Sequence, residues 1–159
     1  MNLDLFSNNV NEMRPMMKAI ARRILNDEDD VEDVVQDALL RLWELRDESV
    51  RNIEDFAKVM VRHMCIDRLR TRHPHVPIEG VEVPTDVQSD GLNDDEERIM
   101  KMIRELPTVQ QTILRMRHVD EIEYSKIAET IGLTEQAVRQ LVSRARRSIL
   151  KRYELNKMK

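Results

Sequence analysis

The chain has 159 residues, which is enough for one helical domain or for two small ones of about 60 to 70 residues each. Hydrophobic residues make up 41% and charged residues 35%, and the three glycines and five prolines are too few for a loop-rich β architecture. The single cysteine, Cys65, excludes an internal disulfide and a thiolate zinc site, and we expect it to be buried.

The formal net charge of −4 hides two blocks of opposite sign. Residues 26–37 carry seven acids and no base, whereas residues 134–159 carry eight bases and two acids. Such segregation predicts different partners for the two parts of the chain. No run of about 18 apolar residues occurs, and residues 1–25 lack a continuous apolar stretch, so we expect a cytoplasmic protein.

The first predicted helix covers residues 11–25, and Pro15 is compatible with it only if the helix begins close to that residue. The second covers residues 29–46. Its apolar residues recur at helical spacing on one stripe: Val31, Val34, Val35, Ala38, Leu39, Leu42 and Trp43. Its opposite face carries Asp33, Gln36, Asp37, Leu40 and Glu44.

The third predicted helix runs from Asn52, a suitable N-cap, to about residue 72. Phe56, Met60 and Met64 mark its buried face, and Lys58 and Arg62 point the other way. By themselves these bases also fit an ordinary solvated face. Asp67 lies near the buried stripe, where a carboxylate needs a partner, and we expect an ion pair with Arg22 or Arg23.

A linker follows, because three prolines and two glycines fall between residues 74 and 91, where the apolar periodicity stops. This segment has several acids and no lysine or arginine, so charge repulsion favours an extended chain. The sequence therefore predicts an all-α protein with two small helical domains, residues 8–73 and 93–153, joined by a flexible acidic linker over residues 74–92.

The second domain begins with predicted helices over residues 93–105 and 107–118. Residues 124–134 then predict a short helix, a turn and a new helix start, because Gly132 suits a left-handed turn and Thr134 can cap the following helix. Small Ala128 allows close helix crossing. This pattern is typical of a helix-turn-helix.

The last helix should bury Val138, Val142, Ala145 and Ile149. The remaining surface is polar and basic: Gln136, Arg139, Gln140, Ser143, Arg144, Arg146 and Arg147. Arginine, glutamine and serine can neutralise phosphates and read base edges in the major groove. A plain helical hairpin with a solvated basic face is the alternative.

Two blocks in the right order resemble the sigma factor family of bacterial RNA polymerase, in its small extracytoplasmic-function type. Residues 30–43 (DVEDVVQDALLRLW) look like the helix that docks on the polymerase clamp, and residues 66–70 (IDRLR) look like the end of the promoter-melting helix. Residues 106–111 (LPTVQQ) through 142–146 (VSRAR) look like the domain that binds the minus-thirty-five element.

The resemblance implies core RNA polymerase and promoter DNA as partners, often with an anti-sigma protein that covers both surfaces. The polymerase-binding residues would be Asp33, Gln36, Asp37 and Leu40. The DNA-binding residues would be Ser125, Lys126, Arg139, Gln140, Ser143, Arg144, Arg146 and Arg147, with Lys58, Arg62 and His63 near the minus-ten element. The loop over residues 46–52 corresponds to the loop that captures a flipped base of that element.

Three other functions, those of a stand-alone DNA-binding regulator, an enzyme and a helical adaptor, agree less well with the sequence. A regulator that binds DNA alone would use the first domain for dimerisation or sensing, but nothing there resembles such a module. An enzyme lacks support, because the four histidines have no metal-ligand spacing and no glycine-rich phosphate loop occurs. We therefore predict no catalytic residue, metal or cofactor. A helical adaptor would leave the capped basic helix without a purpose.

Overall fold

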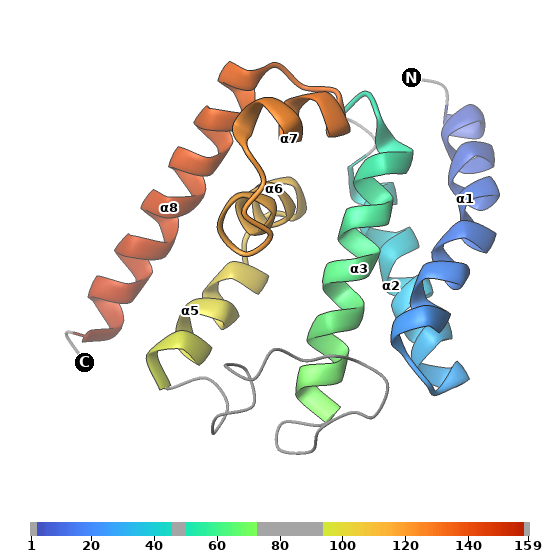
Figure 1. The fold of residues 1–159 in the computed structure, drawn as a ribbon, viewed down its shortest axis with the longest axis horizontal. Coiled ribbons are helices and arrows are strands. Elements are labelled where there is room, and N and C mark those ends of the chain that lie inside the picture. Colours follow the sequence, from blue (N-terminus) through green and yellow to red (C-terminus); the bar gives the residue numbers. More distant parts are fainter. Residues whose placement is uncertain (1–2, 46–49, 73–93, 158–159) are drawn as a thin grey trace. The chain divides into compact units, whose positions relative to one another are not determined.

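The computed structural model describes residues 3–45, 50–72 and 94–157, and the regular elements within these ranges are all α-helices (Figure 1). The chain divides into two compact units, Met1–Val83 and Pro84–Lys159. The predicted all-α architecture of two helical units is therefore confirmed. The predicted linker over residues 74–92 lies outside the described residues.

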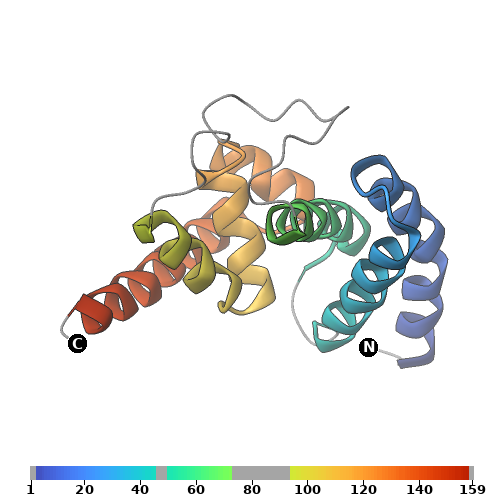
Figure 2. The same ribbon diagram turned by 90° about the horizontal axis from the view of Figure 1, so that it is seen from below.

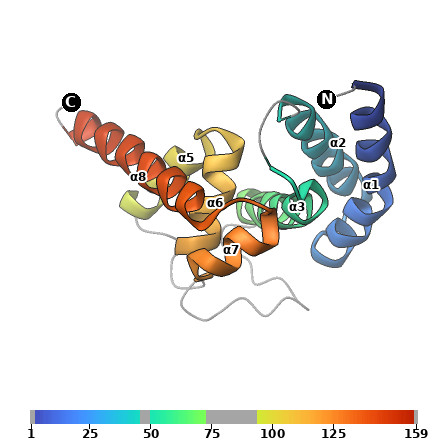
Figure 3. The same ribbon diagram turned by 90° about the horizontal axis from the view of Figure 1, so that it is seen from above.

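The first unit is a bundle of three helices, each of which packs against the other two (Figures 1 and 3). The helices are α1 (Leu3–Ile24), α2 (Glu28–Glu44) and α3 (Ile53–Arg72). Most residues of the predicted apolar stripes of α2 and α3 lie in the core, which includes Val35, Leu42, Phe56 and Met60 and, from α1, Met17. Leu39 and Met64, also on these stripes, are half-buried. Cys65 is buried as predicted, and burial raises the pKa of its thiol to about 12.

Local interactions mark the starts of α2 and α3, which lie within one residue of the predicted ones. Asp27 is the N-cap of α2, and its carboxylate accepts a hydrogen bond from the backbone N–H of Asp29 at 2.8 Å. The acids of the first turn of α2 also suit the positive end of the helix dipole. At the start of α3, the carbonyl of Asn52 accepts the N–H of Phe56 at 3.0 Å.

The expectation for Pro15 was wrong. Helix α1 begins at Leu3, twelve residues before Pro15, and continues through it to Ile24. Proline removes the N–H that would bond to the carbonyl of Asn11, but Asn11 lies on the exposed side of the helix, where water can satisfy that carbonyl. Packing of α1 against both neighbouring helices compensates for the lost hydrogen bond.

Arg68 links the end of α3 to the start of α2. Its Nε donates to the carboxylate of Asp30 at 3.2 Å, and a terminal nitrogen donates to Asp33 at 2.7 Å. Asp30 is buried, whereas Asp33 is exposed. The hydrogen bond to Asp30 is the main reason that the pKa of Arg68 is raised. One guanidinium thus fixes the first turns of α2 against α3.

The predicted pair between Asp67 and Arg22 does not form, because Arg22 bonds to Glu28 at 2.7 Å. Both members of that pair are exposed. Asp67 is half-buried, as its place near the stripe predicts, and Arg23 is exposed. A pair between Asp67 and Arg23 stays a prediction.

The second unit is built around its longest helix. The helices are α5 (Asp94–Arg104), α6 (Thr108–His118), α7 (Tyr124–Ile131) and α8 (Glu135–Lys157). Helices α5, α6 and α7 all pack against α8 (Figure 2). Helix α7 lies by the start of α8, and α5 lies beside its later turns, where Arg152 bonds to Glu105 at 3.2 Å (Figure 1).

The turn between α7 and α8 has the predicted chemistry. Gly132 has a φ of 76°, in the left-handed region, and its N–H bonds to the carbonyl of Ala128 at 2.9 Å. The hydroxyl of Thr134 accepts the N–H of Ala137 at 3.0 Å and so caps α8. Ile127 and Ile131 are buried, as predicted. The helix-turn-helix is thus fixed by local interactions.

A polar contact between α6 and α8 was not predicted. Arg146 directs both Nε, at 2.8 Å, and a terminal nitrogen, at 2.6 Å, to Nε2 of His118. That geometry requires an unprotonated Nε2, which can accept. Burial, followed by the charges of Arg146 and Arg117, lowers the pKa of His118 from its usual 6.5. The folded state therefore favours the neutral form of the His118 imidazole.

Replacement of Arg68 should destabilise the first unit. Arg68→Met keeps the apolar stem but removes the guanidinium from the buried Asp30, and we expect the free energy of unfolding to fall by about 1 to 2 kcal/mol. Urea unfolding followed by the fluorescence of Trp43, the one tryptophan, reports on this unit. Arg22→Met is the control, because its pair with Glu28 is exposed. Equal effects of the two changes would contradict the role given to Arg68.

The contact of His118 predicts a pH dependence. The pKa of His118 is lower in the folded protein than in the unfolded one, so neutral His118 contributes fully to the stability of the fold above pH 6.5, the ordinary value. This contribution is lost as the pH falls below 6.5 toward the folded pKa. His118→Gln, whose amide oxygen can still accept from Arg146, should remove this part of the pH dependence. Thermal unfolding of both proteins at two pH values, about 7.5 and 5.5, measures the difference. Parallel losses on acidification would contradict the assignment.

Candidate functional site

The outer face of α2 carries an acidic and apolar surface. Asp33, Gln36, Asp37 and Leu40 are all exposed there, as predicted. Leu40 exposes 56% of its surface, beside the partly exposed Leu39 and Trp43 of the same helix. Asp33 already bonds to Arg68, so its carboxylate is held in a fixed position. We call these four residues the α2 face.

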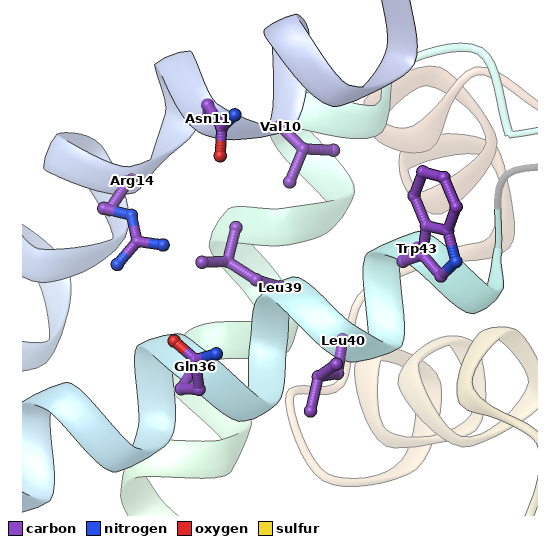
Figure 4. Close-up of a pocket in the computed structure, with 7 residues that line it drawn as sticks. All are labelled: Val10, Asn11, Arg14, Gln36, Leu39, Leu40 and Trp43. Atoms are coloured by element: carbon purple, nitrogen blue, oxygen red, sulfur yellow. The ribbon is translucent and has the colours of Figure 1, made fainter. Parts of the chain in front are cut away.

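A groove of about 190 Å³ continues the α2 face toward α1 (Figure 4). Leu39 points from α2 toward α1, while Leu40 points away from it (Figure 4). The groove is lined by Val10, Asn11, Arg14, Gln36, Leu39, Leu40 and Trp43. The lining is mixed, with apolar side chains from both helices beside the polar Asn11, Arg14 and Gln36. Such a mixture of apolar and polar groups is common in protein interfaces.

The structure corrects the predicted place of Trp43. The sequence assigned it to the buried stripe of α2, but its side chain is 39% exposed at the edge of the groove. Trp43 lies in the last turn of α2, which ends at Glu44. Val10, Asn11 and Arg14 of α1 were also missed, because their proximity to α2 depends on helix packing.

The three residues of α3 that were predicted near DNA do not all lie at the surface. Lys58 and Arg62 are exposed as predicted, and Lys58 lies 3.9 Å from Asp55 and 4.0 Å from Glu54. His63 was predicted to lie with them near DNA, but it is buried, at 3% exposure. It follows Met60 by three residues, so helical spacing places it on the core stripe. The structure therefore gives no support to direct contact of His63 with DNA.

A second surface lies on the first four turns of α8. Arg139, Gln140, Ser143, Arg144, Arg146 and Arg147 are exposed on it, and Val138, Val142 and Ala145 are buried on the opposite side, as predicted. Ser125 and Lys126 are exposed in the first turn of α7. Ile149, predicted to be buried, is half-buried. We call Arg139, Gln140, Ser143, Arg144, Arg146 and Arg147 the α8 face.

Two side chains of the α8 face are held by neighbours. Arg146 contacts His118, as described above. Arg139 lies with its guanidinium carbon 4.5 Å from the centre of the Tyr124 ring, and it also bonds to Glu135 at 2.9 Å. A second guanidinium, that of Arg117 at the end of α6, lies 5.0 Å from the centre of the same ring. These contacts join α6, α7 and α8 around one tyrosine.

Neither a metal-binding cluster nor a membrane-spanning helix is found in the described part of the chain. No cluster of three or more histidine, cysteine or acidic side chains with metal-binding geometry occurs within residues 3–45, 50–72 and 94–157. In the same part of the chain, no helix is both long enough and apolar enough to cross a bilayer.

Comparison with known proteins matches both units to parts of one family. Sigma-70 region 2 matches residues 10–74, which contain the α2 face, and Sigma-70, region 4 matches residues 96–149, which contain most of the α8 face. Together these two matches cover most of the chain, in the family's order.

Two curated relatives are extracytoplasmic-function (ECF) sigma factors. SigJ of Mycobacterium tuberculosis is 26% identical over 150 residues, which cover 86% of this chain and 47% of SigJ. The chain thus spans about half the length of SigJ. SigW of Bacillus subtilis is 21% identical over 165 residues, which cover 93% of this chain and 88% of SigW.

A solved structure of the sigma factor RpoE in complex with the anti-sigma factor NepR, from Bartonella quintana, is 23% identical and covers 94% of this chain and 96% of RpoE. Its TM-score is 0.43. The assignment comes from the two family matches and the curated relatives. The chain belongs to the sigma-70 family of RNA polymerase sigma factors, among its ECF members.

Proposed function

We propose that this protein binds core RNA polymerase through the α2 face and its groove, binds promoter DNA through the α8 face, and so directs promoter-specific initiation of transcription. The observation that carries the proposal is the presence of both surfaces, an acidic and apolar one and a basic one, on two units that match sigma regions 2 and 4 in order. An anti-sigma partner stays a prediction of the family resemblance.

The α2 face has the features of a protein interface. An exposed leucine and a half-exposed tryptophan flank a groove, and carboxylates surround them. Burial of Leu40 and Trp43 by a partner would supply the apolar centre, and the acids would select a basic partner surface. Because Arg68 holds Asp33 in place, less side-chain entropy is lost when that carboxylate meets a partner.

The α8 face has the features of a major-groove reader. Its first turns carry Arg139, Gln140 and Ser143, which can donate to or accept from base edges. Arg144, Arg146 and Arg147 add positive charge for phosphates. Thr134 and Gly132 fix the angle between α7 and α8, so that α7 can contact the DNA backbone through Ser125 and Lys126.

We further propose that Lys58 and Arg62 contact DNA near the minus-ten element. Both are exposed on one face of α3. The weak contacts of Lys58 with Glu54 and Asp55, at about 4 Å, leave its ammonium able to move to a phosphate. The proposed base-capturing loop over residues 46–52 lies partly outside the described residues, so its residues are not assigned.

Substitutions on the α2 face should weaken binding to polymerase. We expect Leu40→Ala to lower the affinity about tenfold and Asp33→Asn with Asp37→Asn to lower it further, because burial of leucine and charge-assisted hydrogen bonds are lost. Competition with a labelled copy of the chain for core RNA polymerase measures this. Glu54→Gln, an exposed acid on α3, is the control. Unchanged affinity of both the Leu40 variant and the double aspartate variant would contradict the proposed site.

Substitutions on the α8 face should separate base reading from phosphate binding. Arg144→Ala should weaken binding to all promoter fragments and reduce the salt slope of the holoenzyme's affinity by about 1. Gln140→Ala should instead change preference at one base pair, by about 1 to 3 kcal/mol. Arg152→Ala is the matched control, because Arg152 lies later on α8 and pairs with Glu105. Tight DNA binding by a chain that ignores polymerase would favour the stand-alone regulator instead.

A further inference from the structure

The ring of Tyr124 occupies a distinctive position between three helices of the second unit. It is the first residue of α7 and half-buried. The guanidinium carbons of Arg139 and Arg117 lie 4.5 Å and 5.0 Å from its centre. The negative face of an aromatic ring attracts a guanidinium at these distances. One phenol ring therefore interacts with a cation from α6 and a cation from α8.

The two cations differ in what else they can do. Arg117 is half-buried. Its Nε is enclosed by protein atoms and has no hydrogen-bond partner in the described structure. Arg139 is 59% exposed and lies on the α8 face. Arg139 is therefore the one of the two that lies on the proposed DNA-binding surface, and it would carry the orientation imposed by the ring to that surface.

Stacking constrains a guanidinium without consuming its hydrogen bonds. A guanidinium that lies over a ring still has the N–H groups on its edge free to donate. The carboxylate of Glu135 accepts from one terminal nitrogen of Arg139 at 2.9 Å and limits rotation further. The remaining donors are sufficient for a bidentate contact with O6 and N7 of guanine, the commonest specific contact of arginine in the major groove.

We propose that Tyr124 is a positioning residue that sets base selectivity: it holds the Arg139 guanidinium in the orientation that reads a guanine in the upstream promoter element. This inference rests on the proposed function of the α8 face. A free arginine side chain loses considerable rotamer entropy when it binds a base, and a side chain already ordered by a ring loses less. Removal of the ring should therefore cost selectivity at one base pair and leave the others unchanged.

The experiment uses the full chain with core RNA polymerase and a promoter library in which the upstream element is randomised. Sequencing of the transcripts gives the preference at each base pair. Arg139→Ala first identifies the position that Arg139 reads, as the one where a guanine preference disappears. Tyr124→Leu should then reduce the preference at that same position about two- to fivefold, the effect of one exposed cation–π contact.

Two variants separate the electrostatics of the ring from its packing. Tyr124→Phe keeps the negative ring face and should retain the wild-type preference. Tyr124→pentafluorophenylalanine keeps the shape of a phenyl ring but withdraws electron density from its face, and should lose preference as Tyr124→Leu does. This pair keeps the test decisive if Tyr124→Leu fails to fold. Tyr153→Leu removes the other tyrosine, which lies roughly 20 Å beyond Arg139 along α8. This variant should change no preference.

The outcomes are distinct. Loss of the same preference in Tyr124→pentafluorophenylalanine and Arg139→Ala, with no added loss when Tyr124→Leu is combined with Arg139→Ala, supports the inference. Equal preferences for the phenylalanine and pentafluorophenylalanine variants would overturn it, as would an Arg139→Ala protein with unchanged preferences. If the wild-type chain gives no promoter-dependent transcripts at all, the proposed function itself fails.

Discussion

The bond network of Arg68 connects the interior of the first unit to its outer surface. The same guanidinium satisfies buried Asp30 and exposed Asp33, so the packing of α3 against α2 also fixes a carboxylate of the α2 face. A buried carboxylate such as that of Asp30 needs a partner, and its partner Arg68 also reaches Asp33 at the surface. The position of Asp33 on the α2 face therefore depends on α3, the helix that carries the proposed minus-ten contacts.

The second unit achieves the same rigidity by different means. Its turn is fixed locally by Gly132 and Thr134, while His118 and Tyr124 hold two arginines of α8 from neighbouring helices. Each arginine is restrained by a group that leaves donors available, an imidazole nitrogen in one case and a ring face in the other. A rigid helix-turn-helix with ordered arginines is suited to reading base edges, since less entropy remains to be lost on binding.

The parts of this fold that the sequence predicts are those set by neighbours along the chain. Helical periodicity located Val35, Phe56 and Val142 in the core, and local capping chemistry located the turn at Gly132. Trp43 was misplaced because periodicity cannot show that its last turn lacks a covering helix. His63 was misplaced although its spacing from Met60 already put it on the buried stripe. Pro15 was misjudged because packing outweighed a local penalty.

The remaining contacts join residues that periodicity cannot relate. Arg68 and Asp30 are 38 residues apart, and Arg146 and His118 are 28 apart, so only the packed helices bring them together. These pairs nevertheless determine which charges on each surface are already occupied. The sequence places Asp33 and Arg139 on exposed faces, whereas the structure shows that each of them also contacts a residue of its own unit. In a chain with so few aromatic residues, such polar contacts supply orientation that an aliphatic core does not. The selectivity proposed for each surface therefore depends on contacts beneath it as much as on the exposed residues themselves.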